Sequence, residues 1–179
     1  MRKLRIGIAG YGVVGNRRRF YIDRHPNMQT VGVSDIIFNE SGKFDDGVDF
    51  YNDYNLLFKN NLDVLFVSLP TYLAAEATIK GLENGCHVFC EKPPAKNIIE
   101  LNKVIEIEKK YPDLKLKYGF NHRYHESIKK ALKIINTEKL GKIINLRGVY
   151  GKSKVIPFSG GWRSKRELAG GGILLDQGI

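Results

Sequence analysis

A glycine-rich stretch near the N-terminus has the spacing of a phosphate-binding turn. Residues 10–15 read Gly-Tyr-Gly-Val-Val-Gly, the pattern G-x-G-x-x-G, between an apolar run at 4–9 and a helical pattern. In a strand-turn-helix unit the three glycines permit a tight turn, close approach of a pyrophosphate and close helix packing, and the helix N-terminus binds the phosphates. The alternative is a glycine turn without a ligand. The residues predicted to bind a dinucleotide here are Gly10, Tyr11, Gly12, Val13, Val14 and Gly15.

An acidic residue follows at the distance that such a turn requires. Asp35 lies 20 residues after Gly15, at the end of a predicted strand over 29–34. A carboxylate there accepts hydrogen bonds from the adenosine ribose and repels a 2′-phosphate, and Ile36-Ile37-Phe38 offer no cation to such a phosphate. We therefore expect NAD to be preferred over NADP. A purely turn-forming role for Asp35 is the alternative.

Three consecutive arginines, Arg17, Arg18 and Arg19, lie in the helix after the turn. Neighbouring positions on a helix cannot all face one ligand. We interpret the three as surface residues.

These residues need a scaffold, and the first 120 residues supply the pattern of one. Short apolar runs alternate with helical patterns, which is typical of a doubly wound parallel sheet of the Rossmann type. The predicted strands are 4–9, 29–34, 64–67, 87–90 and 115–118, with a short strand near Phe50 inside an otherwise loop-like stretch. The predicted helices run from the glycine turn to about residue 24, over 54–59, over 73–84 and from 98 to before Pro112.

The pattern changes after Gly119. A helix is predicted over 124–136, followed by a longer alternating strand over 142–150 of the kind found in antiparallel sheets. We predict a Rossmann domain over 1–120. Residues 121–179 are predicted to begin an α+β second domain with an incomplete, mostly antiparallel sheet.

Five blocks in a fixed order give the chain a family resemblance. Besides the glycine turn, these are Ser68-Leu69-Pro70-Thr71, the segment 85–93 that ends in Cys90-Glu91-Lys92-Pro93, Gly119-Phe120-Asn121-His122-Arg123-Tyr124, and residues 170–179. Together they resemble the Gfo/Idh/MocA family of nicotinamide-dependent sugar oxidoreductases over essentially the whole chain. The resemblance implies cofactor contacts from Ser68, Leu69, Pro70, Glu91 and Lys92, and substrate contacts from Asn121 and Arg123. It also implies a homo-oligomer at full length.

The resemblance further implies that Lys92 and Asp176 are catalytic. A carbinol carbon releases hydride only as its hydroxyl proton departs, so such a site needs an acid-base group and a cation. The family's last block continues to a histidine one residue beyond Ile179, and the family's second domain is much longer. We therefore expect a fragment that does not turn over substrate alone. After Pro70 the chain has Thr71-Tyr72-Leu73-Ala74 where the family often has Asn-x-x-His.

Three further features bear on the site. A strand must end sharply at Glu91-Lys92-Pro93, so we predict a cis bond before Pro93.

Trp162 and Arg163, in a glycine-rich loop, could stack on a sugar or bind a phosphate; core packing of Trp162 is the alternative. Cys86 and Cys90 are too few for a disulfide scaffold, and with His87 they do not form a zinc site, so we expect reduced, buried thiols and no metal.

Charge and hydropathy narrow the function classes. The net charge is +10, and all of the excess lies in residues 91–179, which hold 19 Lys and Arg against 9 Asp and Glu. Because many of these lysines are scattered on a helix face, solubility is the favoured explanation of the positive charge. Binding of an anionic substrate is the second explanation and binding of nucleic acid the third. We expect a cytoplasmic protein with no membrane or nucleic-acid partner. The leading hypothesis is an NAD-dependent oxidoreductase acting on a sugar or nucleotide-sugar hydroxyl. The alternatives are an inositol or free-sugar dehydrogenase, and a non-catalytic dinucleotide-binding regulator or inactive fragment.

Overall fold

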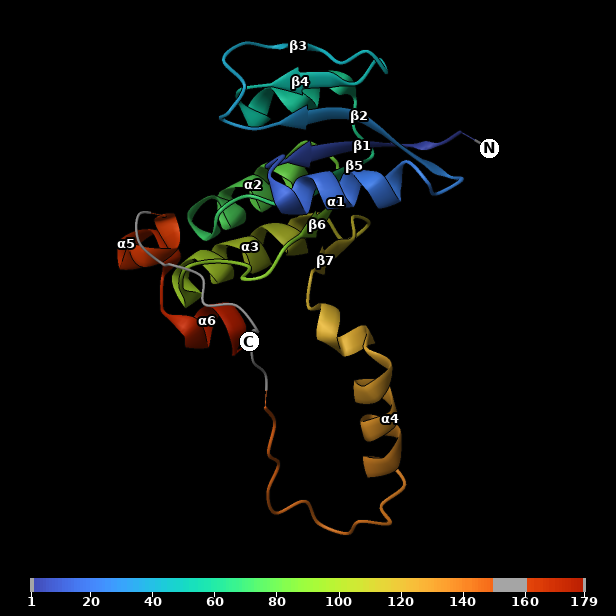
Figure 1. The fold of residues 1–179 in the computed structure, drawn as a ribbon, viewed down its shortest axis with the longest axis vertical. Coiled ribbons are helices and arrows are strands. Elements are labelled where there is room, and N and C mark those ends of the chain that lie inside the picture. Colours follow the sequence, from blue (N-terminus) through green and yellow to red (C-terminus); the bar gives the residue numbers. More distant parts are fainter. Residues whose placement is uncertain (1, 150–160, 179) are drawn as a thin grey trace. The chain divides into compact units, whose positions relative to one another are not determined.

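The computed structural model describes residues 2–149 and 161–178, and a mostly parallel sheet is its centre. The strand order is β3-β4-β2-β1-β5-β6-β7, and only β3 runs antiparallel to its neighbour (Figure 1). The strands are β1 (Leu4–Ala9), β2 (Met28–Ser34), β3 (Gly42–Lys43), β4 (Asp49–Tyr51), β5 (Val64–Val67), β6 (His87–Cys90) and β7 (Leu116–Tyr118). The order reverses direction beside β1. Ligands of open α/β sheets bind at such a switch point, outside the carboxyl ends of the strands.

Helices cover both faces of this sheet. Those packed with the sheet include α1 (Val13–Ile22), η1 (Tyr54–Asn60, a 3₁₀ helix), α2 (Thr71–Glu83) and α3 (Ile98–Lys110). The other helices of the described residues are η2 (Asn121–Tyr124), α4 (Glu126–Ile135), η3 (Trp162–Ser164), α5 (Arg166–Ala169) and α6 (Ile173–Gln177). Alternation along β5 serves both faces. Leu65 and Val67 pack in the cluster that includes Ala74 of α2, whereas Val64 and Phe66 pack in the cluster that includes Ile22 of α1. This two-sided burial explains why β5 is apolar at four consecutive positions.

The strands predicted over the first 120 residues are confirmed within one residue, and the loop-like stretch around Phe50 holds β3 and β4. Helix α1 ends at Ile22, two residues earlier than predicted, where Asp23 caps it by donating its backbone N–H to the carbonyl of Arg19. Helix α2 begins at Thr71, directly after Pro70. Helix α3 is held at its start by Asn97, whose side chain accepts a hydrogen bond from the backbone N–H of Glu100 at 2.9 Å.

The predicted strand over 142–150 is wrong for the residues that can be described. Residues 142–149 form no strand, and residue 150 lies outside the described residues. The physical reason is that this segment has no neighbouring strand to pair with among the described residues. A strand needs ladder hydrogen bonds to a neighbour, and the described part of this region offers none. The alternating apolar side chains are present but exposed, for example Ile144 at 94% and Val149 at 89%. No antiparallel second sheet is found among the described residues.

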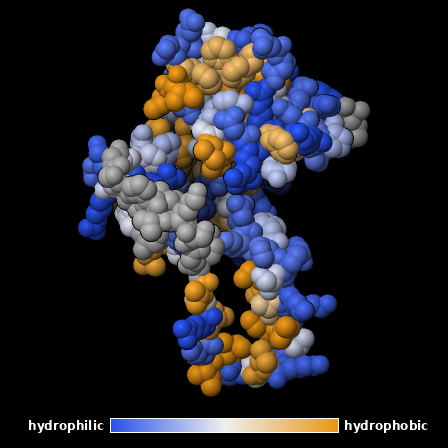
Figure 2. Space-filling model, in the orientation of Figure 1, coloured by the Kyte–Doolittle hydropathy of each residue, from blue (hydrophilic) through white to orange (hydrophobic). Residues whose placement is uncertain are grey.

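The chain divides into two compact units, residues 1–119 with 161–179, and residues 120–160. Figure 2 shows apolar side chains on the surface of the second unit, where α4 exposes Ile128, Leu132 and Ile134. The first unit contains the whole sheet and also α5 and α6, which the sequence placed with the second domain. Within the described residues, no helix has the length and apolar character needed to span a membrane.

Both cysteines lie in the core beside the central strands. Cys86 precedes β6 and Cys90 ends it, with exposures of 1% and 0%, and neither forms a disulfide. The prediction of buried, reduced thiols is confirmed.

Candidate active site

The glycine turn is folded so tightly that two of its positions admit only glycine. Gly10 has a φ of +89°, and a Cβ there would lie 2.5 Å from the carbonyl oxygen of Ser68. A Cβ on Gly15 would lie 2.0 Å from the carbonyl oxygen of Gly10. The first contact brings the end of β5 against the turn, and the second packs α1 onto it. Both are the backbone approaches that the motif requires.

Gly12 is different because space is open around it. No atom lies within 4 Å of the position that its Cβ would take. The side chain of Asn16 donates to the carbonyls of Tyr11 and Gly12, at 2.7 and 3.0 Å. These carbonyls are therefore satisfied by Asn16, whereas the first N–H groups of α1 have no partner within the helix. An open backbone edge at a helix N-terminus fits a pyrophosphate.

Asp35 is held beside the turn by two backbone donors. Its Oδ2 accepts a hydrogen bond from the N–H of Tyr11 at 2.8 Å, and its Oδ1 accepts one from the N–H of Ile37 at 3.2 Å. Each carboxylate oxygen can accept a further bond. The carboxylate is thus fixed where β2 ends, and it can receive the hydroxyls of a ribose.

The end of β6 carries the next group of candidates. The bond between Lys92 and Pro93 is cis, which confirms the prediction. Glu91 points to α1 and accepts hydrogen bonds from Arg18, one of them from Nε at 2.8 Å. A Cβ on Gly119 would lie 2.7 Å from Oε2 of Glu91, so the end of β7 closes over the same carboxylate. The strand end is thereby fastened to the helix that follows the glycine turn.

Lys92 contacts Asp176, which α6 brings from the far end of the chain. Its Nζ lies 3.2 Å from Oδ1 of Asp176 and also donates to the backbone carbonyl of that residue. Burial alone would raise the pKa of Asp176. Hydrogen bonds from Gln177 and Lys92, with the charges of Lys92 and Arg163, nevertheless hold this pKa below its usual value. The side chain of Lys92 is 30% exposed and that of Asp176 is 29% exposed, so a small molecule can reach the pair.

The segment that delivers Asp176 is anchored to the first unit by backbone contacts. Gly170 has a φ of +79°, and a Cβ there would lie 2.4 Å from the carbonyl oxygen of Lys96. Helix α5 packs against α2. Trp162 lies edge-on to Tyr72 of α2, with ring centroids 6.4 Å apart, and the guanidinium of Arg163 stacks on Trp162 at 4.3 Å. Trp162 is only partly buried and Arg163 is exposed, so both can contact a ligand.

Comparison with known proteins decides the family. Residues 4–120 match the Gfo/Idh/MocA family, described as an oxidoreductase family with an NAD-binding Rossmann fold. The chain belongs to the Gfo/Idh/MocA oxidoreductase family. The matched residues include the glycine turn, Asp35 and the Glu91-Lys92-Pro93 end of β6, which confirms the resemblance.

Three known proteins show what the chain is similar to. It is 29% identical to D-glucoside 3-dehydrogenase of Escherichia coli over 98% of this chain and 51% of that protein. The structure of myo-inositol 2-dehydrogenase from Lactobacillus plantarum matches with a TM-score of 0.69 and 27% identity over 80% of this chain and 44% of that one. Scyllo-inositol dehydrogenase from Lactobacillus casei, solved with NAD(H) and scyllo-inositol, shares the fold at 20% identity, with a TM-score of 0.68 over 78% and 43%. The chain spans about half the length of the curated relatives it matches.

Other predicted residues are placed without forming part of this arrangement. Val13 and Val14 lie in the first turn of α1 with their side chains exposed. Asn121 and Arg123 lie in η2 of the second unit, both exposed, and their contact with substrate stays a prediction. Among the described residues, no group of three or more His, Cys, Asp or Glu side chains could hold a metal ion.

The interpretation of the three arginines as surface residues is wrong for two of them. Arg17 is exposed, but the side chain of Arg18 is 25% exposed and that of Arg19 only 13%. Arg18 lies over the ring of Phe89 at 4.7 Å and pairs with Glu91. A long side chain can bury its stem and reach an interior carboxylate, which helical spacing alone does not reveal. Asn16 was also missed, although an amide directly after a glycine turn is a local signal.

Proposed function

We propose that this chain forms the cofactor-binding part of an NAD-dependent dehydrogenase that oxidises a hydroxyl of a cyclic polyol or sugar. The observation that carries the proposal is the contact between Lys92 and Asp176, at the carboxyl end of β6 and beside the helix that follows the glycine turn. The open backbone at Gly12 and the fixed carboxylate of Asp35 support a dinucleotide with a free 2′-hydroxyl. The nicotinamide would supply the hydride acceptor.

The residues of this chain would divide the remaining work. In its neutral form the amine of Lys92 would accept the proton of the substrate hydroxyl as the hydride leaves the carbon, and the ammonium that results would stabilise the negative charge that develops on the oxygen. Asp176 would hold that amine in place through its carboxylate and backbone carbonyl. Glu91, paired with Arg18, would fix the strand end that carries Lys92. Trp162 and Arg163 would contact the ring or a phosphate of the substrate.

Some of the relatives support a cyclic polyol or sugar as the substrate class of this proposal. Inositol and glucoside dehydrogenases act on cyclic carbinols that carry no phosphate. Lys129, Lys130 and Lys133 are exposed on α4, as charges that serve solubility are, and therefore do not point to a phosphate on the substrate. A polyol or unphosphorylated sugar is therefore the first candidate, and a nucleotide sugar is the second.

A binding experiment tests the proposal. The chain is saturated with NADH and titrated with myo-inositol, methyl glucoside and UDP-glucose, alongside the variant Lys92→Met. We expect one of the first two to bind, and the variant to lose that binding with a much smaller change in its NADH affinity. Turnover is measured on the longest natural form of the protein, where loss of the lysine should lower the rate by about 10² to 10⁴. NADH binding with no response to any of the three compounds would favour the regulator hypothesis instead.

A further inference from the structure

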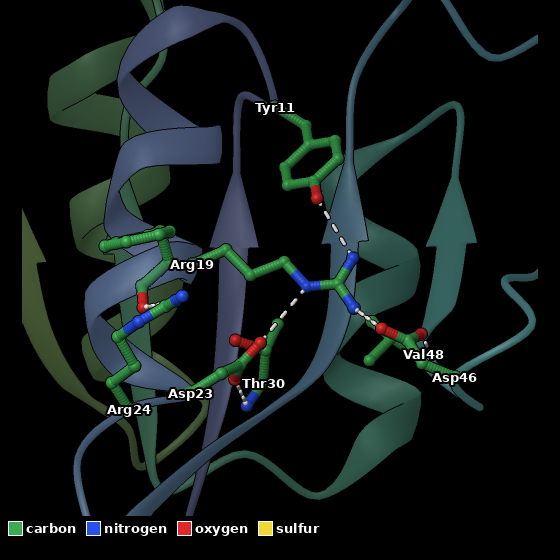
Figure 3. A network of polar contacts seen from close by, with 8 residues as sticks. Tyr11, Arg19, Asp23, Arg24, Thr30, Asp46 and Val48 are labelled. Atoms are coloured by element: carbon green, nitrogen blue, oxygen red, sulfur yellow. Dashed lines mark hydrogen bonds and ion pairs between the residues drawn. The ribbon is translucent and has the colours of Figure 1, made fainter.

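Arg19 joins three segments around the glycine turn (Figure 3). Its Nη1 donates to the hydroxyl of Tyr11 at 2.9 Å, and its Nε donates to Oδ2 of Asp23 at 3.3 Å. Its Nη2 donates to the carboxylate of Asp46, in the turn between β3 and β4. Two of the partners are themselves fixed, since Asp23 accepts from the N–H of Thr30 and Asp46 from that of Val48. Arg19 is thus a rigid donor aimed at Tyr11.

Tyr11 is held at three separate atoms. Its N–H donates to Asp35, its carbonyl accepts from Asn16, and its hydroxyl accepts from Arg19. These partners come from the residue directly after β2 and from two positions of α1. Tyr11 is the only residue of the turn 10–15 with a polar side chain, and that side chain accepts a hydrogen bond from Arg19, whose side chain is 13% exposed. The tyrosine therefore does more than occupy a variable position of the motif.

The ring of Tyr11 also touches the turn that carries Asp35. It packs against Phe38 with ring centroids 6.3 Å apart and against Phe44 at 6.1 Å. Phe38 closes that turn, because its N–H donates to the carbonyl of Asp35 at 3.2 Å. Tyr11 thus contacts both ends of the segment 35–38, through its backbone at Asp35 and through its ring at Phe38.

We infer that Arg19 and Tyr11 are positioning residues that hold Asp35 in place for the adenosine ribose, and so set the preference for a cofactor without a 2′-phosphate. This inference rests on the proposed function, because it requires a dinucleotide at the glycine turn. Loss of the tyrosine hydroxyl removes the hydrogen bond that fixes the ring to Arg19 and leaves only the cation–π contact, with the guanidinium 5.9 Å from the ring centroid. The turn 35–38 then loses its fixed neighbour, and the carboxylate becomes free to leave the position that favours one cofactor over the other.

The test uses ADP-ribose and its 2′-phosphorylated form as probes, with affinities measured by calorimetry on the full chain. Tyr11→Phe removes only the hydroxyl. Arg19→Lys keeps the positive charge but removes the planar guanidinium and its several N–H donors. We expect each variant to weaken ADP-ribose binding about fivefold, the scale of one lost hydrogen bond, with a smaller loss for the phosphorylated probe. The ratio of the affinity for ADP-ribose to the affinity for its 2′-phosphorylated form should therefore fall. Tyr21→Phe, on the exposed side of α1, is the matched control and should change neither affinity.

Two further arms separate positioning from simple structural support. In an Asp35→Asn background, Tyr11→Phe should no longer change the ratio of affinities, because the group it positions is gone. Asp46→Asn removes only the charge of an exposed partner of Arg19, and its amide oxygen can still accept the hydrogen bond, so it should change the ratio of the two affinities less than Tyr11→Phe does.

The inference would be overturned if Tyr11→Phe and Arg19→Lys bound both probes with wild-type affinity. It would also be overturned if the variants lost affinity for both probes by the same factor. An Asp46→Asn variant that matches Tyr11→Phe would also overturn it, by assigning the effect to the hairpin. A wild-type chain that binds neither probe would instead refute the proposed cofactor site.

Discussion

The Nζ atom of Lys92 lies 3.2 Å from Oδ1 of Asp176, although 84 residues separate them in the sequence. The first residue follows β6 and the second belongs to α6, so the contact depends on the way the segment 161–178 packs on the sheet domain. A charged hydrogen bond of this kind in a partly buried site is stronger than one in water. It therefore has a measurable electrostatic signature.

Removing the lysine charge should raise the pKa of Asp176. In the wild type this pKa lies below the ordinary value of 3.8, so the pair stabilises the fold above that pH and the contribution is lost as the pH falls through the folded pKa. In Lys92→Met the pKa should move upward, and acid unfolding should lose part of its pH dependence. Carboxyl-carbon NMR of Asp176 measures the first effect. Lys129→Met, in the second unit, is the control, and an unchanged Asp176 pKa in Lys92→Met would contradict the contact.

Alanine substitutions at two glycines of the same turn should affect different properties, fold stability at Gly15 and NADH binding at Gly12. Gly15→Ala forces a Cβ to 2.0 Å from a backbone oxygen, so it should destabilise the fold by about 1–3 kcal/mol or more. Gly12→Ala meets no atom within 4 Å, so the melting temperature should stay the same while NADH binding weakens. Thermal melts and NADH titrations on both variants check this. A Gly12→Ala chain with wild-type NADH affinity would show that the pyrophosphate does not lie at that position.

Asp35→Ala should lower the preference for NADH over NADPH. The carboxylate favours the ribose hydroxyls and repels a 2′-phosphate, and its removal takes away both effects. We expect weaker NADH binding and stronger NADPH binding in the variant, measured by fluorescence titration of both cofactors. Asp45→Ala is the control, an exposed aspartate of the β3–β4 turn. Equal wild-type affinity for NADPH and NADH would refute a selecting role for Asp35.

Arg18 and Glu91 should be energetically coupled. Their side chains are 25% and 15% exposed, and the pair connects α1 to the end of β6. Residues in direct contact show interaction energies of about 0.5–3 kcal/mol in double-mutant cycles. Urea unfolding of Arg18→Met, Glu91→Gln and the double variant should place this pair within that range. Arg17→Met is the matched control, since Arg17 is exposed on the same helix. Additive effects of Arg18→Met and Glu91→Gln would show that the pair does not fasten the strand end.

The sheet domain could be predicted from sequence because its signals are local. Val64 to Val67 form an uninterrupted apolar run, and Gly10, Gly12 and Gly15 have positions that only one kind of turn satisfies. The cis bond before Pro93 was predictable for the same reason, since the constraint lies in adjacent residues. Helix ends were less certain, because Asp23 and Pro70 decide them through capping and backbone geometry.

The remaining features depend on tertiary contacts that no local pattern contains. Arg18 and Arg19 looked like surface residues because their partners, Glu91 and Asp46, lie far away in the chain. The apolar alternation after residue 142 predicted a strand, but alternation describes only which face would be buried and cannot supply a pairing partner. The approach of Asp176 to Lys92 likewise depends on Gly170, whose backbone contact with Lys96 anchors the segment that carries the aspartate.

The burial of Cys86 and Cys90 gives the sheet domain an internal reporter of its own opening. Burial raises the pKa of Cys86 to about 11 and that of Cys90 to about 12, so neither thiol is ionised at neutral pH in the folded chain. Alkylation requires the thiolate, and it can therefore proceed only from molecules in which the central strands have separated. The labelling rate at neutral pH thus measures how often β6 leaves the core. A bound dinucleotide should slow this rate in proportion to its saturation, which would give a ligand assay that needs no turnover.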